Sequence, residues 1–216
     1  MSLDTKALLE SIKQAREKSS KRKFSQSIEL IVNLRDIDMK KPEGKIQERI
    51  ELPNGVGKQT KICVFASGEL ALKAKRAGAD LVMERRELEA LAGDKKKRKS
   101  LAQTYDYFIA EAPLMPVIGK ILGSALGPKG RMPSPVPPTA NIAEIMKKQR
   151  KTVIMRTRGQ PVLQCRIGSE EMPDEQVVQN VRAVLGRLEG RLKRGLENVE
   201  SIYIKTTMGS AVKIKV

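Results

Sequence analysis

Apolar and polar residues alternate in the first and last thirds of the chain, and this alternation predicts strands with one buried face. These strands are expected over residues 25–34, 45–52, 152–158 and 161–167. At the C-terminus, residues 202–215 predict a β-hairpin with a polar turn that contains Gly209. A glycine there lets another backbone approach closely, so the turn is a candidate contact surface. An ordinary hairpin turn is the alternative.

A repeat close to 3.6 residues predicts a helix at each end of this strand pattern. The first helix carries Leu3, Leu8 and Ile12 on one face and leads into a basic run over residues 18–23. The second begins at Pro173, a residue suited to a first helical turn, and is expected to end at Gly195. Its apolar face consists of Val177, Val181, Val184, Leu185, Leu188 and Leu192.

The pattern changes at Thr60, where short apolar strands begin to alternate with helical segments. Such alternation predicts βαβ units and a parallel sheet. The expected strands are residues 61–66, 80–83 and 107–110, and the expected helices are residues 69–77, 85–91 and 141–150. Residues 119–138 are rich in Gly and Pro and are expected to form a long irregular loop.

These patterns predict two domains. The terminal parts, residues 1–55 and 151–216, are expected to form one discontinuous α+β domain, and residues 56–150 an α/β insert. The chain crosses between them near Asn54-Gly55 and again near Gln149-Arg150. A hinge of two strands is therefore expected, and it favours relative motion of the domains.

The chain is strongly basic, with 42 Lys+Arg against 25 Asp+Glu, a formal net charge of +17 and a pI of about 10.0. This balance is typical of proteins that bind nucleic acid. A membrane surface is the competing polyanion, but no apolar run approaches the ~20 residues of a spanning helix. The N-terminal residues lack the apolar core of a signal peptide, so a cytoplasmic location is expected.

The sequence lacks the side chains that several kinds of catalytic mechanism need. The sequence contains no histidine, which excludes Ser-His and Cys-His nucleophile pairs and zinc sites that use His. Cys63 and Cys165 lack the spacing of metal ligands and are expected to be small buried residues. Residues 53–60 resemble a P-loop, but Leu52 and Gln59 stand where it needs Gly and Ser or Thr. We expect no enzyme, metal or cofactor.

Two basic segments of the insert leave alternatives open. The run Lys95-Lys96-Lys97-Arg98-Lys99 is either a solvated helix face or a phosphate contact. Within residues 119–138, glycine N–H groups together with Lys129 and Arg131 are able to cradle a phosphate. A rigid structural connection explains the same prolines equally well.

Three motifs together resemble the family of large-subunit ribosomal protein one, in its archaeal form. They are KFSQSIEL at residues 23–30, LGPKGRMPSP at 126–135 and YIKTTMG at 203–209, and the resemblance extends over essentially the whole chain. It implies a discontinuous domain of split β-α-β type, with an antiparallel sheet and helices, that binds large-subunit (23S) rRNA. It also implies that the insert is a Rossmann-like three-layer α/β domain.

The resemblance further implies a structural protein of the mobile side stalk, near the tRNA exit site of the large ribosomal subunit in the cytoplasm. The implied partners are the rRNA stalk element, transiently the exit-site tRNA, and the leader or coding region of the protein's own mRNA. Through that mRNA many members of the family repress their own translation. We expect a monomer when the protein is free, without contact to membranes.

The motif match assigns RNA binding to Lys23, Phe24, Ser27, Glu29, Arg156, Gly168, Thr206, Thr207, Met208 and Gly209. Ser27 and Glu29 project from one face of the first strand and Ile28 from the other, so the polar pair faces outward. A carboxylate can accept hydrogen bonds from ribose hydroxyls or base amines. The alternatives are an ion pair with a neighbouring Lys for Glu29 and a core position for Phe24.

We expect affinity from Lys and Arg on phosphates and specificity from the shape of a folded RNA. Three Phe, three Tyr and no Trp offer little surface for base stacking. Two other functions stay open at this point. One is an RNA-modifying or nucleotide-using enzyme built on the insert, and the other is a basic adaptor for protein partners.

Overall fold

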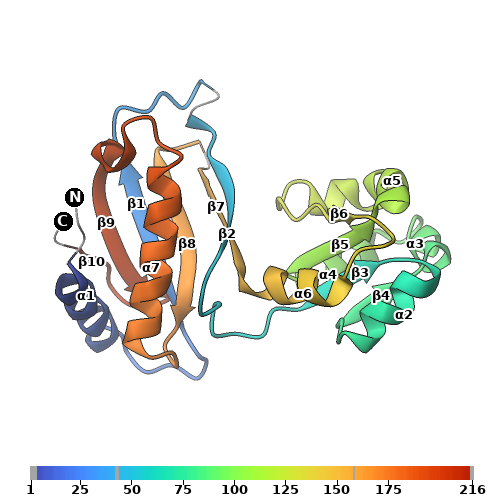
Figure 1. Cartoon of the computed structure of the whole chain (residues 1–216), viewed down its shortest axis with the longest axis horizontal. Coiled ribbons are helices and arrows are strands. Elements are labelled where there is room, and N and C mark those ends of the chain that lie inside the picture. The colour runs from blue at the N-terminus through green and yellow to red at the C-terminus, as the bar shows by residue number, and fades with distance from the viewer. Residues whose placement is uncertain (1–3, 42–43, 158, 215–216) are drawn as a thin grey trace. The chain divides into compact units, whose positions relative to one another are not determined.

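The computed structural model describes residues 4–41, 44–157 and 159–214. The chain divides into two compact units (Figure 1): unit 1 is Met1–Lys58 with Lys151–Val216, and unit 2 is Gln59–Arg150. Each unit has its own sheet and its own hydrophobic core. The chain therefore enters and leaves unit 2 through two connections, close to the positions where the sequence pattern changes.

Unit 1 is built on a six-stranded sheet in the order β10-β9-β1-β8-β7-β2, and every neighbouring pair is antiparallel. The strands are β1 (Ser27–Leu34), β2 (Gln47–Glu51), β7 (Thr152–Thr157), β8 (Val162–Ser169), β9 (Val199–Thr206) and β10 (Val212–Lys213). Alternate residues of β1 are buried, beginning with Ile28, and the residues between them are partly exposed. The period of two read from the sequence thus becomes one covered and one open face.

Helices α1 (Thr5–Glu17) and α7 (Asp174–Glu189) pack together on the covered face of this sheet (Figure 1). The carboxylate of Asp4 caps α1 by accepting a hydrogen bond from the Lys6 N–H at 3.1 Å. The predicted end of the second helix at Gly195 is wrong, because α7 ends at Glu189 with Gly190 as its cap. Gly195, at a φ of +54°, instead begins the short 3₁₀ helix η3 (Gly195–Asn198). Leu3, Arg158 and Lys215, which belong to predicted elements, lie outside the described residues.

Unit 2 contains a parallel sheet of four strands in the order β4-β3-β5-β6. Its strands are β3 (Ile62–Phe65), β4 (Leu81–Met83), β5 (Tyr107–Glu111) and β6 (Ser134–Val136). Helices α2 (Gly68–Arg76) and α6 (Ile142–Lys151) pack on one face. The other face carries η2 (Ala112–Leu114), α3 (Arg85–Ala90), α4 (Lys95–Thr104) and α5 (Met115–Leu126). The predicted fold class, an antiparallel α+β part with a parallel α/β insert, is confirmed.

The expectation of an irregular loop over residues 119–138 is wrong for residues 119–126, which are helical, and for residues 134–136, which form β6. Residues Met115–Leu126 form α5, in which Ile118, Leu122 and Leu126 are fully buried on one side. Gly119 and Gly123 lie elsewhere on the helix, where a Cβ would meet open space. The buried stripe at a spacing of four residues outweighs the low helix propensity of these glycines.

Candidate nucleic-acid interface

Three segments that are distant in the sequence meet at one end of the unit 1 sheet (Figure 1): the start of β1 and the ends of β8 and β9. Ile28 of β1 lies opposite Gly168 on one side and opposite Thr206 on the other. The sheet therefore brings Ser27 and Glu29 together with Gly168 and with the turn that follows Thr206. That turn, residues 206–209, completes the cluster.

Gln26 joins these segments from the inside and is only 1% exposed. Its Nε2 donates to Ser19 Oγ at 2.9 Å and to the Ser20 carbonyl at 3.1 Å, and its Oε1 accepts from the Met208 N–H at 3.1 Å. Its own N–H donates to the Glu170 carboxylate at 2.9 Å. We did not predict this role, because nothing local distinguishes a buried glutamine from an exposed one.

The hydroxyls of the turn are used to fix its shape. Thr206 is buried, and its Oγ1 donates to Ser19 Oγ at 2.9 Å and accepts from the Gly209 N–H at 3.0 Å. Thr207 Oγ1 accepts from the Ser27 N–H at 3.0 Å. A Cβ on Gly209 would overlap Thr206 Oγ1, so the turn needs glycine there. The Met208 side chain is left outside this network and is 56% exposed.

Glu29 lies on the open face of the sheet between two basic residues. Its opposite neighbours are Arg166 on β8 and Lys205 on β9. Among the described residues, the Glu29 carboxylate has no hydrogen-bond partner and no ion-pair partner. The ion pair with a neighbouring Lys that the sequence left open is therefore not formed among these residues. The carboxylate is therefore available as an acceptor, with positive charge on both sides. Neither basic neighbour was among the predicted site residues, although their strands alternate in step with Glu29.

Cys165 lies on the other face of β8, beneath this cluster. Burial, with a smaller contribution from the charge of Glu29, raises the pKa of its thiol to about 12. The thiol therefore stays protonated at neutral pH and acts as a small apolar residue.

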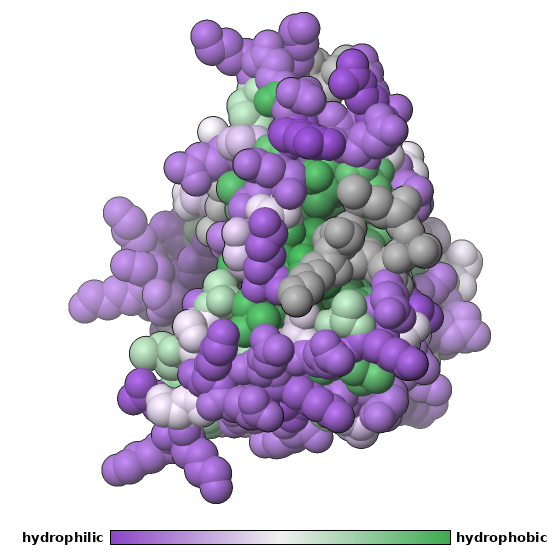
Figure 2. Space-filling model, turned by 90° about the vertical axis from the view of Figure 1, so that its left-hand side faces the viewer, coloured by the Kyte–Doolittle hydropathy of each residue, from purple (hydrophilic) through white to green (hydrophobic). Residues whose placement is uncertain are grey.

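Lys23 and Phe24 lie in the segment that leads into β1, and both are exposed. Phe24 is 51% exposed, so it is not the core residue of the alternative hypothesis. Lys18, Lys21 and Arg22 are exposed in the same segment and extend its positive charge. Seen from the side of unit 1 that carries α1 and β10, hydrophilic side chains cover most of the surface (Figure 2).

Two of the predicted residues have different surroundings. Gly168 is buried under α7, where a Cβ would come within 3.2 Å of Val177 Cγ2, so close packing also favours a glycine there. Arg156 lies on β7, two strands from β1 in the sheet, and pairs with Gln47 and Gln164. It is therefore not part of the cluster at the sheet end.

Comparison with known proteins identifies the family. Residues 15–210 match the Ribosomal protein L1p/L10e family. This chain belongs to that family. It is 45% identical over 207 residues to the large ribosomal subunit protein uL1 of Methanothermobacter thermautotrophicus, a match that covers 96% of this chain and 98% of the relative.

Two further relatives carry the same name. The protein of Methanocaldococcus jannaschii is 44% identical over 213 residues, covering 99% of this chain and 97% of the relative. The protein of Pyrococcus abyssi is 44% identical over 216 residues, covering 100% of this chain and 98% of the relative. The resemblance read from the three motifs is thereby confirmed, and this member of the L1 family is a ribosomal protein and not an enzyme.

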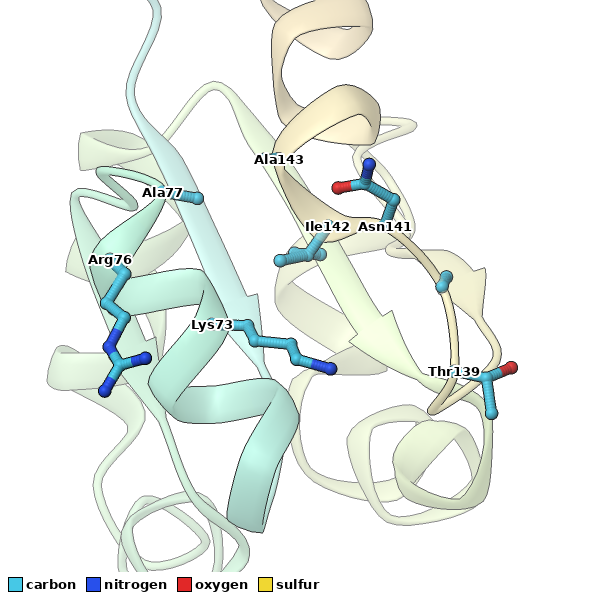
Figure 3. A pocket seen from close by; sticks show the side chains of 8 residues that line it. Lys73, Arg76, Ala77, Thr139, Asn141, Ile142 and Ala143 are labelled. Atoms are coloured by element: carbon cyan, nitrogen blue, oxygen red, sulfur yellow. The ribbon is translucent and has the colours of Figure 1, made fainter.

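The enzyme alternative would place its catalytic site on unit 2 of this L1 family member. Its described surface has a hollow between α2 and the start of α6 (Figure 3), with Lys73 and Arg76 on one side and Asn141 and Ile142 on the other. The residues that line it include no carboxylate and no thiol. Across residues 4–41, 44–157 and 159–214, no three His, Cys, Asp or Glu side chains are grouped to hold a metal ion. In the same ranges no helix has the length and apolarity to cross a membrane.

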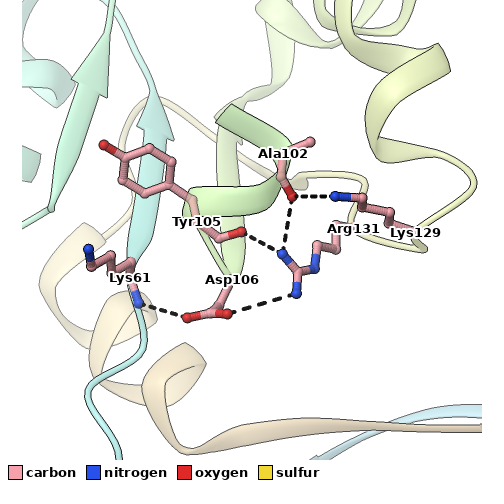
Figure 4. Close-up of polar contacts among 6 residues, drawn as sticks. All are labelled: Lys61, Ala102, Tyr105, Asp106, Lys129 and Arg131. Atoms are coloured by element: carbon pink, nitrogen blue, oxygen red, sulfur yellow. Dashed lines mark hydrogen bonds and ion pairs between the residues drawn. The ribbon is translucent and has the colours of Figure 1, made fainter. Parts of the chain in front are cut away.

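The motif at residues 126–135 uses its basic side chains inside unit 2 (Figure 4). Lys129 Nζ donates to the Ala102 carbonyl at 3.2 Å. Arg131 Nη1 donates to the carbonyls of Ala102 at 3.2 Å and Tyr105 at 2.9 Å, and its Nη2 lies 3.8 Å from the Asp106 carboxylate. These carbonyls end α4 and lack helical partners. The contacts favour a rigid structural connection over a phosphate cradle.

Proposed function

We propose that this protein binds large-subunit rRNA with the surface at the end of the unit 1 sheet. The observation that supports this proposal is the network around Gln26, which joins Ser19, Ser20, Glu170 and Met208 in one arrangement. A preorganised surface of this kind suits a folded RNA, because less ordering entropy is lost on binding.

Within that surface we assign different tasks to the residues. Met208 and Phe24 supply exposed apolar contact, Glu29 accepts hydrogen bonds from ribose or base groups, and Lys23 contacts phosphate. Thr206, Thr207 and Gly209 shape the turn, and Gly168 lets β8 pack under α7. We extend the surface to Lys205 and Arg166, which flank Glu29. Arg156 is a more distant contact on the open face.

The names of the relatives support a place in the large ribosomal subunit, where we propose that the protein forms the mobile side stalk near the tRNA exit site. Unit 1 is then the rRNA-binding domain, unit 2 the Rossmann-like insert, and the two connections a hinge. Transient contact with exit-site tRNA belongs to the same proposal. The free protein is a cytoplasmic monomer.

Repression of its own mRNA follows if that message folds into a structure similar to the rRNA site. A rigid surface can recognise both RNAs by shape, but only one at a time. A fragment of the message should therefore displace the rRNA fragment competitively, and Met208→Ala should weaken both complexes to a similar extent. Simultaneous binding of the two RNAs would contradict a shared surface.

The first test measures binding of the rRNA stalk fragment, and of an unrelated hairpin, over a salt series. Met208→Ala and Thr207→Val should each weaken the stalk complex at least about tenfold, the loss expected for ~1.4 kcal/mol of contact energy. Met132→Ala is the matched control, since Met132 is 37% exposed but belongs to unit 2. If wild type binds both RNAs equally, or if the control loses as much as Met208→Ala, the proposed surface is wrong.

A further inference from the structure

The basic run of the insert forms the first half of α4, and its five cations have two different environments. Lys95, Lys96, Lys97 and Lys99 are exposed. Arg98 is partly buried, and its Nη1 donates to the Ile121 carbonyl of α5 at 3.0 Å. Packing thus accounts for Arg98, whereas the four lysines project into solvent.

The position of these lysines on the helix is unfavourable. Lys95, Lys96 and Lys97 occupy the first turn of α4, which has no acidic residue. The N-terminal end of a helix carries a partial positive charge and favours anions, so lysines there lower helix stability. Asp94 compensates in part by capping the Lys97 N–H at 2.9 Å and by lying 3.6 Å from the Lys97 ammonium.

Helix α2, on the opposite face of the same sheet, has the favourable arrangement. Its basic residues Lys73, Lys75 and Arg76 are in the last turn, and Glu69 is in the first. The charges of α2 therefore suit the helix that carries them, and those of α4 do not. Positions that break a local rule without a structural gain are expected at functional sites.

We propose that the exposed lysines of α4 form a second RNA contact, on unit 2, that binds backbone phosphates without reading sequence. An anion bound there reduces the repulsion of the first-turn lysines from one another and from the positive N-terminal end of α4. RNA fits better than a protein, because protein interfaces need an apolar centre. The large exposed apolar side chains described in unit 2, Leu72 and Met132, lie outside α4. Only the choice of RNA as the polyanion rests on the proposed function.

The test compares two full-length variants that each lose three positive charges from unit 2. One is Lys95→Gln/Lys96→Gln/Lys99→Gln, which keeps the Asp94–Lys97 contact, and the control is Lys73→Gln/Lys75→Gln/Arg76→Gln on α2. Binding of a plain RNA duplex without the stalk structure is measured from about 50 to 200 mM salt. Thermal melting of each variant checks that unit 2 stays folded.

The α4 variant should bind the duplex more than about tenfold more weakly at ~0.1 M salt, and its salt slope should fall by roughly 0.9 for each lost phosphate contact. The α2 variant should keep a slope close to that of wild type. Equal losses in both variants would show a general charge effect and overturn the proposal, as would no loss in either. Met132→Ala, which removes an exposed apolar side chain of unit 2 outside α4, should leave duplex binding unchanged. Selective binding of the stalk fragment is measured separately, so failure at the unit 1 surface is distinguishable from failure at α4.

Discussion

Replacement of Asn180 should reveal how strongly buried amides hold unit 1 together. Asn180 lies on α7 and is fully buried. Its Nδ2 donates to the carbonyls of Gly55 and Ile167, both at 2.8 Å, and its Oδ1 accepts from the Asn54 N–H at 3.2 Å. This one side chain therefore connects α7, the end of β8 and the segment through which the chain leaves unit 1.

Asn180→Ala removes three hydrogen bonds. It leaves the buried carbonyls of Gly55 and Ile167 and the partly buried N–H of Asn54 without that partner. A buried group that loses its partner costs about 1–3 kcal/mol. We therefore expect the variant to lose about 3–5 kcal/mol of unfolding free energy, which is a large share of the 5–15 kcal/mol typical of proteins.

The matched control is Asn54→Ala. The Asn54 side chain also donates twice, to the Gln176 carbonyl at 3.2 Å and to Gln179 Oε1 at 2.7 Å, but at an exposed position. Water can replace these bonds, so the expected loss is below about 1 kcal/mol. The assay is native-state hydrogen exchange at the amides of β8, which reports on unit 1 even if the two units unfold separately. A loss from Asn180→Ala no larger than that of the control would refute the reasoning.

Three further changes have separate expected outcomes. Gly209→Ala displaces Thr206 Oγ1 and should weaken binding of the stalk fragment at least about tenfold. The control Gly119→Ala places a methyl group in open space on α5, so it should leave this binding unchanged. It should also raise the free energy of unfolding by about 0.5–1 kcal/mol. Arg131→Ala loses its bonds to the end of α4 and should lower the stability of unit 2 by about 1–2 kcal/mol in urea unfolding, with RNA affinity unchanged; reduced affinity would revive the phosphate cradle. The raised pKa of the Cys165 thiol, about 12 in the folded state, keeps it protonated there while the unfolded thiol ionises near pH 8.5. The contribution of this thiol to the free energy of unfolding is therefore fully present below about pH 8.5 and falls by up to ~1.4 kcal/mol per pH unit above it. In urea unfolding between pH 8 and 10, Cys165→Ala should lose less free energy of unfolding than wild type. Identical pH profiles would exclude the effect.

The strands were predictable because each has a simple period. In β1 the buried residues alternate without interruption, and the buried strands of unit 2 are short apolar runs. Helix α5 was missed because Gly119, Gly123 and the prolines that follow them in residues 128–138 are loop signals when they are considered singly. The buried residues of α5, which are four positions apart, outweigh these loop signals because they pack against the sheet. Local propensity loses to tertiary packing in this segment.

The candidate interface was predictable only through the resemblance of its motifs. Charge and composition indicate a polyanion, but they do not indicate which lysines face it. The register of β1 with β8 and β9 is what places Arg166 and Lys205 beside Glu29. That register depends on pairing between residues more than a hundred positions apart, which no local pattern contains.

Buried amide side chains perform one task at several places in unit 1. Asn180 holds the exit segment, and Asn198 accepts from the Arg194 N–H and donates to the Arg35 carbonyl. An amide offers a donor and an acceptor in fixed directions, so it specifies how irregular segments meet where the sheet ladder has ended.

Gln26 differs from these two residues because its partners include the turn that carries Met208. At this place the hydrogen bonds that stabilise the fold also set the position of the proposed RNA contact. Loss of the Gln26 amide therefore combines the destabilisation expected at Asn180 with the weakened RNA binding expected at Met208. Loss of the exposed Met208 side chain affects binding alone. The difference follows from burial, because only the buried residue supports both the core and the surface.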